Sequence, residues 1–136
     1  MTAKELKIRQ EEKTAAVDYL KKAKDNYSQM LAAIEKKNYN ASATLALQCA
    51  ISSADAICVF EKGVRSVSQD HFDVCELVSS LSIPEAKEKA KTLRKIITKK
   101  NIVQYERRSI FQDEASEMVK LTSRFFHWVE SLLPKE

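Results

Sequence analysis

Residues 39–60 read YNASATLALQCAISSADAICVF, and this stretch decides the fold of the chain. Its apolar residues recur at spacings of three and four, which is the pattern of one helix face. Further apolar residues, among them Leu45, Ile51 and Val59, occupy the other faces. A helix that is apolar nearly all round must be buried on several sides. We therefore expect the other helices to pack around this one.

Two polar residues, Gln48 and Asp55, interrupt this apolar helix. They are seven residues apart, so they lie on nearly the same side after about two turns. An unpaired carboxylate is costly in such surroundings, and Asp55 needs either a partner or a wet cleft. A lysine or a tyrosine hydroxyl is the expected partner if Asp55 is buried. Otherwise Gln48 and Asp55 face a binding site or a dimer axis, and both residues are candidates for binding.

The composition predicts a single all-α domain. The chain has 136 residues with one glycine and two prolines, which leaves little scope for hairpins. No apolar run approaches the ~20 residues that span a bilayer, so we expect no membrane partner. The charged N-terminus lacks the apolar core of a secretion signal, and a cytoplasmic location is therefore expected.

The three cysteines, Cys49, Cys58 and Cys75, lie within apolar helical faces, where thiols behave as small buried hydrophobic groups. They fit a reducing compartment. Neither His71 nor His127 stands at a metal-ligand spacing from a cysteine. We expect no metal site and no cofactor.

Five helices are predicted in one compact bundle. The first covers about residues 4–37, with residues 1–12 as a polar N-terminal extension of it and residues 13–136 as the bundle. Asn38 to Asn40 separate it from the central helix, which ends at Gly63. The third helix starts from Ser68 as its N-cap, the fourth follows Pro84, and the last begins at the acidic run after Phe111. Residues 99–111 show no clear periodicity and are expected to be irregular.

Positive charge is concentrated in one part of the chain. Residues 87–108 contain nine lysines and arginines and two glutamates, whereas the whole chain carries a net charge of +4. This distribution is typical of a surface that meets phosphate or an acidic partner, and it is also found on ordinary solvated helices. The candidate binding residues here are Arg94, Lys99, Arg107 and Arg108.

Several short motifs resemble the HEPN superfamily (higher eukaryotes and prokaryotes nucleotide-binding domain). They are the YNASA opening at Tyr39, the pair Asp70-His71, the KN…QY segment at residues 100–105 and the closing FFHWVESLLP at residues 125–134. The resemblance covers residues 15–134. It implies an α-helical up-and-down bundle and a homodimer. It also implies a role in prokaryotic toxin–antitoxin modules with a nucleotidyltransferase partner, or in metal-independent ribonucleases.

The same resemblance places the family's catalytic arginine at Lys100, its polar neighbour at Asn101 and its histidine at Tyr105. Lysine keeps the positive charge but loses the planar fork that grips phosphate. A tyrosine, with an ordinary pKa near 10, is a poor proton shuttle at neutral pH. The preferred hypothesis is therefore a homodimeric module that binds RNA, nucleotide or a nucleotidyltransferase-type partner without strong catalysis.

Two alternatives remain open from the sequence. In the first, the protein is a metal-independent endoribonuclease in which Lys100 holds phosphate while Tyr105 or His71 transfers protons. Alternatively, His71 is interpreted as a surface residue in a capping turn. In the second, the chain is a structural dimerisation domain, and its basic surface only keeps it soluble. His127, one position off the apolar stripe of the last helix, is interpreted as a flanking residue.

Overall fold

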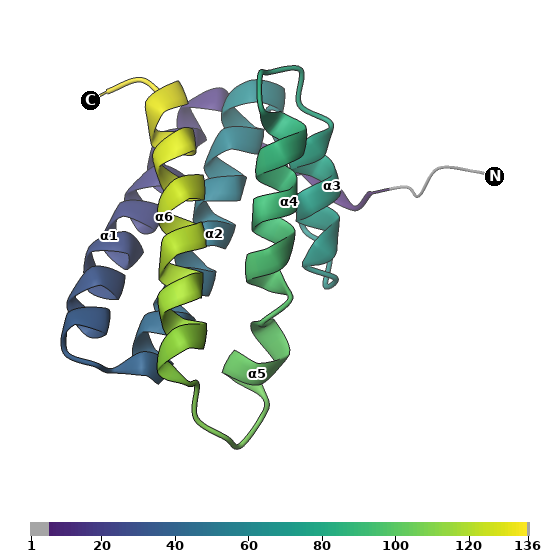
Figure 1. The fold of residues 1–136 in the computed structure, drawn as a ribbon. Coiled ribbons are helices and arrows are strands. Elements are labelled where there is room, and N and C mark those ends of the chain that lie inside the picture. Colours follow the sequence, from purple (N-terminus) through teal and green to yellow (C-terminus); the bar gives the residue numbers. More distant parts are fainter. Residues whose placement is uncertain (1–5, 136) are drawn as a thin grey trace.

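The computed structural model describes residues 6–135 and shows helices packed side by side in one bundle (Figure 1). The three long helices are α1 (Ala16–Glu35), α2 (Tyr39–Lys62) and α6 (Gln112–Leu132). Two shorter helices, α3 (Phe72–Ser79) and α4 (Ala86–Ile97), pack against each other beside α2. These are the five helices that the sequence predicts, and the all-α bundle is confirmed.

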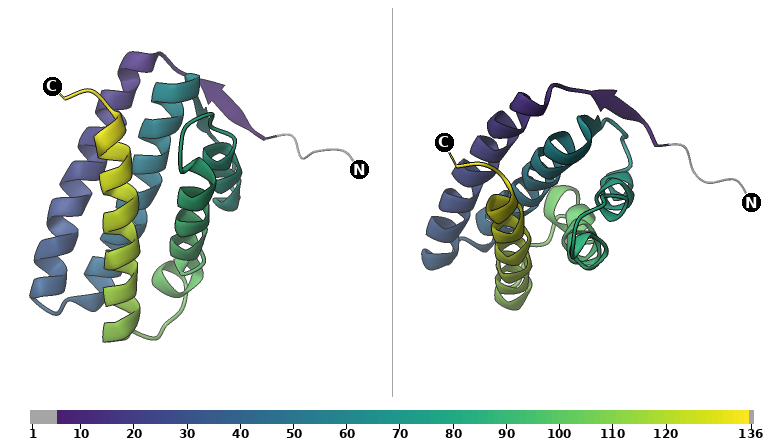
Figure 2. Two further views of the ribbon diagram at one scale, coloured as in Figure 1. Left: turned by 45° about the horizontal axis from the view of Figure 1, so that its top comes forward. Right: turned by 90° about the horizontal axis from the view of Figure 1, so that it is seen from above.

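The central position of α2 is also confirmed. This helix contacts α1, α3, α4 and α6, as the view along the bundle makes clear (Figure 2). Its side chains are buried along nearly its whole length, and many of them are small. Small side chains such as Ala46, Ala50 and Ala54 let neighbouring helices approach closely, while Leu47 and Ile57 fill the space between them.

By length and composition α2 also meets the requirements of a membrane-spanning helix. The expectation that no apolar run is long enough to span a bilayer is therefore wrong for α2 by length and composition. However, 67% of the apolar window lies buried inside the bundle. A core helix of a globular domain has this property because its apolar surface faces other helices.

The turns at the two ends of α2 have well-defined stereochemistry. Between α1 and α2, Lys37 takes the left-handed conformation (φ 62°), and the Asn38 amide donates to the Ala33 carbonyl at 2.9 Å. This hydrogen bond closes a Schellman motif. The residue that ends the helix by its left-handed conformation is therefore Lys37, one residue before the expected Asn38. At the other end Gly63 is left-handed (φ 66°) and ends α2 as predicted.

The N-terminal part of the chain differs from the sequence-based expectation. Residues Ile8–Gln10 form strand β1, which pairs antiparallel with β2 (Val64–Ser66). After the short 3-10 helix η1 (Lys13–Ala15), α1 begins only at Ala16. The helix breaks here because Glu12 is extended, and because the turn at Gly63 brings β2 back alongside residues 8–10. The part of the predicted extension at residues 1–5 lies outside the described residues.

Two further boundaries shift relative to the sequence. Ser68 is not the N-cap of α3: its hydroxyl accepts from the Asp70 amide and donates to Asp73, and α3 begins at Phe72. In the stretch expected to be irregular, the structure has a further short helix, α5 (Lys100–Gln104). The loop that follows α5 leads directly into α6 (Figure 1).

Candidate functional site

The carboxylate of Asp55 is the buried charge of the central helix. Asp55 is 5% exposed and accepts a hydrogen bond from Nε of Arg65 on β2 at 3.2 Å. Burial raises the pKa of the Asp55 carboxyl to about 6, and the positive charge of Arg65 partly offsets this rise. The expected partner was a lysine or a tyrosine hydroxyl, and this expectation is wrong. An arginine is brought there by the Gly63 turn.

The short β-sheet places two arginines opposite each other, Arg9 on β1 and Arg65 on β2. Like charges directly across a strand pair are unfavourable. The structure resolves the conflict because each arginine has its own carboxylate. Arg9 pairs with Glu11 at 2.6 Å, and Arg65 pairs with Asp55. Tyr19 on α1 lies under the Arg65 guanidinium, 5.3 Å from the ring centroid.

Two neighbouring cavities share Ile51, Asp55 and Arg65 as lining residues. The first, about 420 Å³, lies toward α1 and is also lined by Gln48 and Lys22. The second, about 320 Å³, lies toward α3; its remaining lining residues are Ser66, Val67, Ser68, His71 and Val74. The structure thus brings together three of the candidates, Gln48, Asp55 and His71, around one buried ion pair.

His71, just before α3, is half-buried. Burial lowers the pKa of His71, and the positive charge of Lys100 lowers it further, against the opposing effect of Asp70. The imidazole is therefore mostly neutral at pH 7.

Lys100 and Tyr105, the two residues at the family's catalytic positions, lie together on α5 and at its end. The Tyr105 side chain is 72% exposed, and Nζ of Lys100 is 5.8 Å from its ring centroid. Asn101 is exposed between them in the sequence, and its carbonyl accepts from the Tyr105 amide at 2.9 Å. Neither Lys100 nor Tyr105 lines the two cavities beside Asp55.

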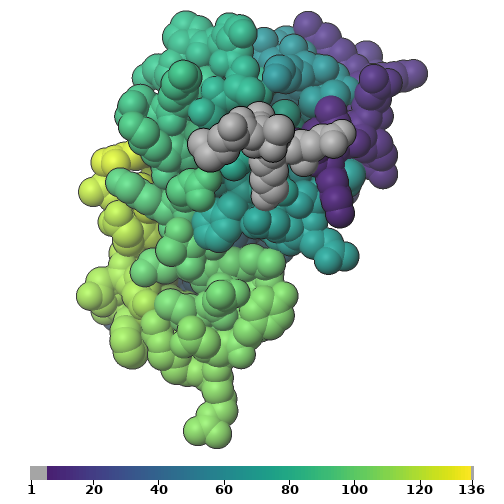
Figure 3. All heavy atoms as spheres, turned by 90° about the vertical axis from the view of Figure 1, so that its right-hand side faces the viewer, coloured from purple at the N-terminus to yellow at the C-terminus, as the bar shows by residue number. Residues whose placement is uncertain are grey.

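A second exposed aromatic ring stands at the end of the same loop. Phe111 is 61% exposed, and the Arg108 guanidinium lies 4.6 Å from its ring centroid. Arg107 is exposed in the loop between the two rings. We call the surface formed by Lys100, Asn101, Tyr105, Arg107 and Phe111 the α5 surface. Figure 3 shows the segment around residues 100–110 in light green at the lower end of one face of the molecule.

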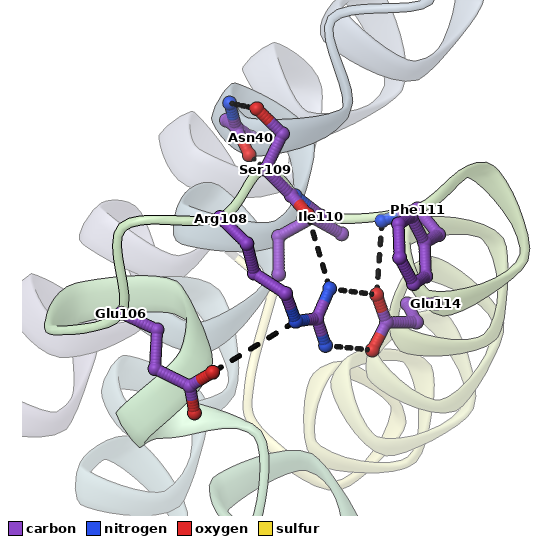
Figure 4. Close-up of polar contacts among 7 residues, drawn as sticks. All are labelled: Asn40, Glu106, Arg108, Ser109, Ile110, Phe111 and Glu114. Atoms are coloured by element: carbon purple, nitrogen blue, oxygen red, sulfur yellow. Dashed lines mark hydrogen bonds and ion pairs between the residues drawn. The ribbon is translucent and has the colours of Figure 1, made fainter.

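Arg108 itself is held by carboxylates. It forms two hydrogen bonds of 2.8 Å with Glu114 and a longer ion pair with Glu106 at 3.8 Å (Figure 4). Glu114 also accepts from the Phe111 amide at 2.9 Å and so caps the start of α6. The Arg108 ion pair and this amide lower the pKa of Glu114 to about 2. Arg108 therefore fixes the loop and supports the Phe111 ring.

The remaining basic candidates lie on or next to α4. The Arg94 guanidinium is 5.2 Å from the ring centroid of Phe72, which follows His71. Arg94 also lines a groove of about 500 Å³ between α3 and α4, together with Lys87 and Lys91. Lys99 lies within electrostatic range of Glu114. Lys99 directly precedes α5, whereas Arg94 lies at the groove between α3 and α4, and neither residue lines the cavities beside Asp55.

Asn40, in the YNASA segment, holds the α5–α6 loop in place. Its side-chain oxygen accepts from the Ile110 amide at 2.8 Å, and its side-chain nitrogen lies 3.4 Å from the Ser109 hydroxyl (Figure 4). Ile110 itself is buried. Sequence reasoning used this asparagine only as a helix break. The signal for its role was a polar residue opening an otherwise apolar helix.

The other titratable candidates have structural roles. All three cysteines are buried, and burial raises the pKa of Cys49 to about 12 and that of Cys75 to about 11. His127 is a flanking residue as interpreted, with its Nε2 3.0 Å from the Tyr27 hydroxyl. Within residues 6–135 no group of histidine, cysteine and carboxylate side chains has a metal-binding arrangement.

Comparison with known proteins identifies the family. The family model described as HEPN domain matches residues 16–132, which is most of the chain and includes α1 through α6. No curated protein and no solved structure matches the chain. The HEPN resemblance seen in the sequence is therefore confirmed at the level of the family.

Replacing Asp55 by asparagine should change the pH dependence of stability. The Asp55 pKa is raised from 3.8 to about 6 in the folded protein, so between these values the unfolded state binds fewer protons. The free energy of unfolding therefore falls as pH rises from about 4 to about 6, by about 2–3 kcal/mol from this group. The variant Asp55→Asn lacks this contribution.

We expect urea denaturation at several pH values to show that the free energy of unfolding of Asp55→Asn increases relative to that of the wild type as pH rises from 4 to 7. Other groups cancel in this comparison, and the lowered pKa of Glu114 acts mainly at more acidic pH. A stability difference between wild type and variant that is the same at every pH would contradict the assignment of a raised pKa to Asp55.

Asn40→Ala should loosen the α5–α6 loop, because it leaves the Ile110 amide without its acceptor. The expected cost is about 1–3 kcal/mol of unfolding free energy, together with faster hydrogen exchange at the Ile110 amide. Asn38→Ala is the matched control, since the Asn38 side chain makes no capping hydrogen bond. Equal exchange rates at Ile110 in both variants would show that Asn40 does not hold the loop.

Proposed function

The chain belongs to the HEPN domain family, and from that premise we propose that it binds RNA or nucleotide through the α5 surface without strong catalysis. The observation that carries this proposal is the pair of exposed aromatic rings, Tyr105 and Phe111, each with a cation over it. Exposed rings beside cations are the usual means of holding single-stranded nucleic acid, because bases stack on the rings and cations meet the phosphates.

The charge around these rings supports the same proposal. Four of the five residues of the α5 surface lie within the basic segment 87–108, and Lys99 directly precedes Lys100, so the phosphates of a strand on Tyr105 would meet these cations. Arg107 is exposed and available to phosphate. Arg108 is engaged by Glu114, and its part is to position Phe111. Affinity through these groups should be strongly salt-dependent, because bound cations are released from the nucleic acid.

The chemistry of Lys100 and Tyr105 argues against an efficient nuclease. A lysine is a point charge and does not grip a phosphate with the planar fork of arginine. General acid–base catalysis typically contributes ~10²–10⁴-fold to rate and works best with a pKa near neutrality. A tyrosine hydroxyl at the histidine position does not meet that requirement, whereas binding requires only charge and stacking.

The family context extends the proposal to partners. We propose that two copies form a homodimer in the cytoplasm and that the α5 surfaces of both copies contribute to one binding site. A nucleotidyltransferase-type protein in a toxin–antitoxin module is the proposed protein partner. The exposure of Tyr105 and Phe111 supports a role in contact with another molecule, since large aromatic side chains are usually buried.

A second candidate function is a metal-independent endoribonuclease, and the observation that favours it is the environment of His71. This imidazole is half-buried, mostly neutral and within electrostatic range of Lys100. A neutral imidazole is able to accept a proton, which is the task of a general base. In this alternative Lys100 holds the phosphate, and His71 takes the role that Tyr105 does not fill.

Binding is tested by titrating a short fluorescent single-stranded RNA, and separately ATP, at two salt concentrations. Lys100→Ala should weaken RNA binding several-fold and reduce the slope of log affinity against log salt by ~0.7. The control is Lys24→Ala, which removes an exposed lysine of α1 and should leave affinity nearly unchanged. Equal effects of the two substitutions would show that the α5 surface is not the binding site.

Cleavage is tested by incubating the purified protein with total RNA in EDTA. We expect the RNA to remain essentially intact with wild type, because Lys100 and Tyr105 replace the catalytic pair. Lys100→Ala, Tyr105→Phe and His71→Ala are compared in the same assay. Cleavage by wild type that is lost in Lys100→Ala and His71→Ala would establish the endoribonuclease, with His71 as its base.

A further inference from the structure

Arg65 is held in a fixed position by groups on two helices. Its Nε donates to Asp55 of α2 at 3.2 Å, and its guanidinium plane stands over Tyr19 of α1 at 5.3 Å. The Arg65 backbone is fixed as well, because it lies in β2 opposite Arg9. An arginine constrained in this way loses little further conformational entropy when it binds a ligand.

The outer edge of this guanidinium forms no hydrogen bond or ion pair with the described residues. Only Nε is bonded to Asp55, and within residues 6–135 no protein acceptor bonds the Nη1 or Nη2 groups. The Arg65 side chain is nevertheless only 32% exposed. One N–H of Nη1 and one of Nη2 are parallel along this edge, and such a pair matches two oxygens of a phosphate or carboxylate group.

The surroundings of Arg65 favour phosphate over carboxylate. Ser66 and His71 line the cavity toward α3, and Lys22 lines the cavity toward α1 together with Asp25, which carries the opposite charge. A phosphate has more oxygens to satisfy than a carboxylate, and it is held by such sets of donors around an arginine. Asp55 is already paired with Nε, so its charge is partly neutralised.

The cavity toward α3 has room for more than the phosphate. Its volume is about 320 Å³, and Ile51, Val67 and Val74 supply apolar wall. Ligand sites commonly combine an apolar lining with a few convergent polar groups, and their volumes start at about 300 Å³. The ligand that fits is a small phosphate monoester with a compact apolar or aromatic group.

We propose that Arg65, presented by Asp55 and Tyr19, binds the phosphate of a small phosphate monoester whose organic part lies against Ile51, Val67 and Val74. This site is distinct from the α5 surface, because Lys100 and Tyr105 line neither cavity. His71 lines the cavity toward α3. The site binds its ligand without cleaving or transferring the phosphate.

The test uses calorimetric titration of the 136-residue chain with phenyl phosphate, inorganic phosphate, AMP and phenol. Phenyl phosphate should bind more tightly than inorganic phosphate, and phenol should not bind measurably. AMP binding as tight as that of phenyl phosphate identifies the ligand as a nucleotide, and weaker AMP binding identifies a smaller ester. No saturable binding of phenyl phosphate at millimolar concentration, or equal binding of phenol, would overturn the proposal.

Two substitutions locate the site. Arg65→Lys keeps a positive charge beside Asp55 but removes the planar fork, and it should weaken phenyl phosphate binding by roughly tenfold. The matched control is Arg9→Lys, which changes the arginine directly opposite in the sheet and should have little effect. Unchanged affinity in Arg65→Lys would overturn the assignment.

Val67→Glu provides a variant that does not disturb the buried pair. Val67 is 45% exposed and lines the same cavity, so a carboxylate there should repel phosphate without unfolding the protein. Lys100→Ala should leave phenyl phosphate binding intact, and Arg65→Lys should leave RNA binding intact. Each proposal can therefore fail while the other holds. If both Lys100→Ala and Arg65→Lys lost binding of RNA and of phenyl phosphate, the proposal of two separate sites would be overturned.

Discussion

The burial of α2 on several sides is the constraint on which the rest of the structure depends. Each neighbouring helix has to present an apolar face to it, and the small residues of α2 set how closely they approach. Within this buried helix Asp55 carries a charge that requires a partner. Arg65 meets that requirement, and in doing so it ties strand β2 to the core. One carboxylate thus connects the packing of the bundle to the surface where ligands are proposed to bind.

The sequence is sufficient for the main helices but not for the strands. Apolar spacing locates α1, α2, α3, α4 and α6, because each buries a stripe several turns long. Strands β1 and β2 have three residues each and are paired across more than fifty positions, so no local pattern reveals them. The Schellman turn likewise places a lysine, Lys37, where the sequence favoured asparagine. Tertiary contacts decide such positions, and intrinsic preference does not.

The candidate site could be foreseen only in part. Sequence reasoning identified the need of Asp55 for a partner, but it did not find Arg65, because the direction of the chain after Gly63 follows from the β pairing. It singled out Lys100 and Tyr105 through the family resemblance, and the structure shows them side by side. Phe111 was not singled out, because it ends a stretch without periodicity, in which no pattern indicates which side chains are exposed. In the structure Phe111 is exposed, and the Arg108 guanidinium that pairs with Glu114 lies over its ring.

The apolar character of α2 also bears on how the chain is made. During synthesis α2 emerges as a long apolar segment, and such a segment is prone to aggregate while it is exposed to solvent. However, α1 precedes it along the chain and joins it through a very short turn, so a helical hairpin forms from adjacent residues at once. Because of this order, α1 can bury part of the apolar surface of α2 before the later helices are synthesised. The last helix, α6, then buries a further part of that surface.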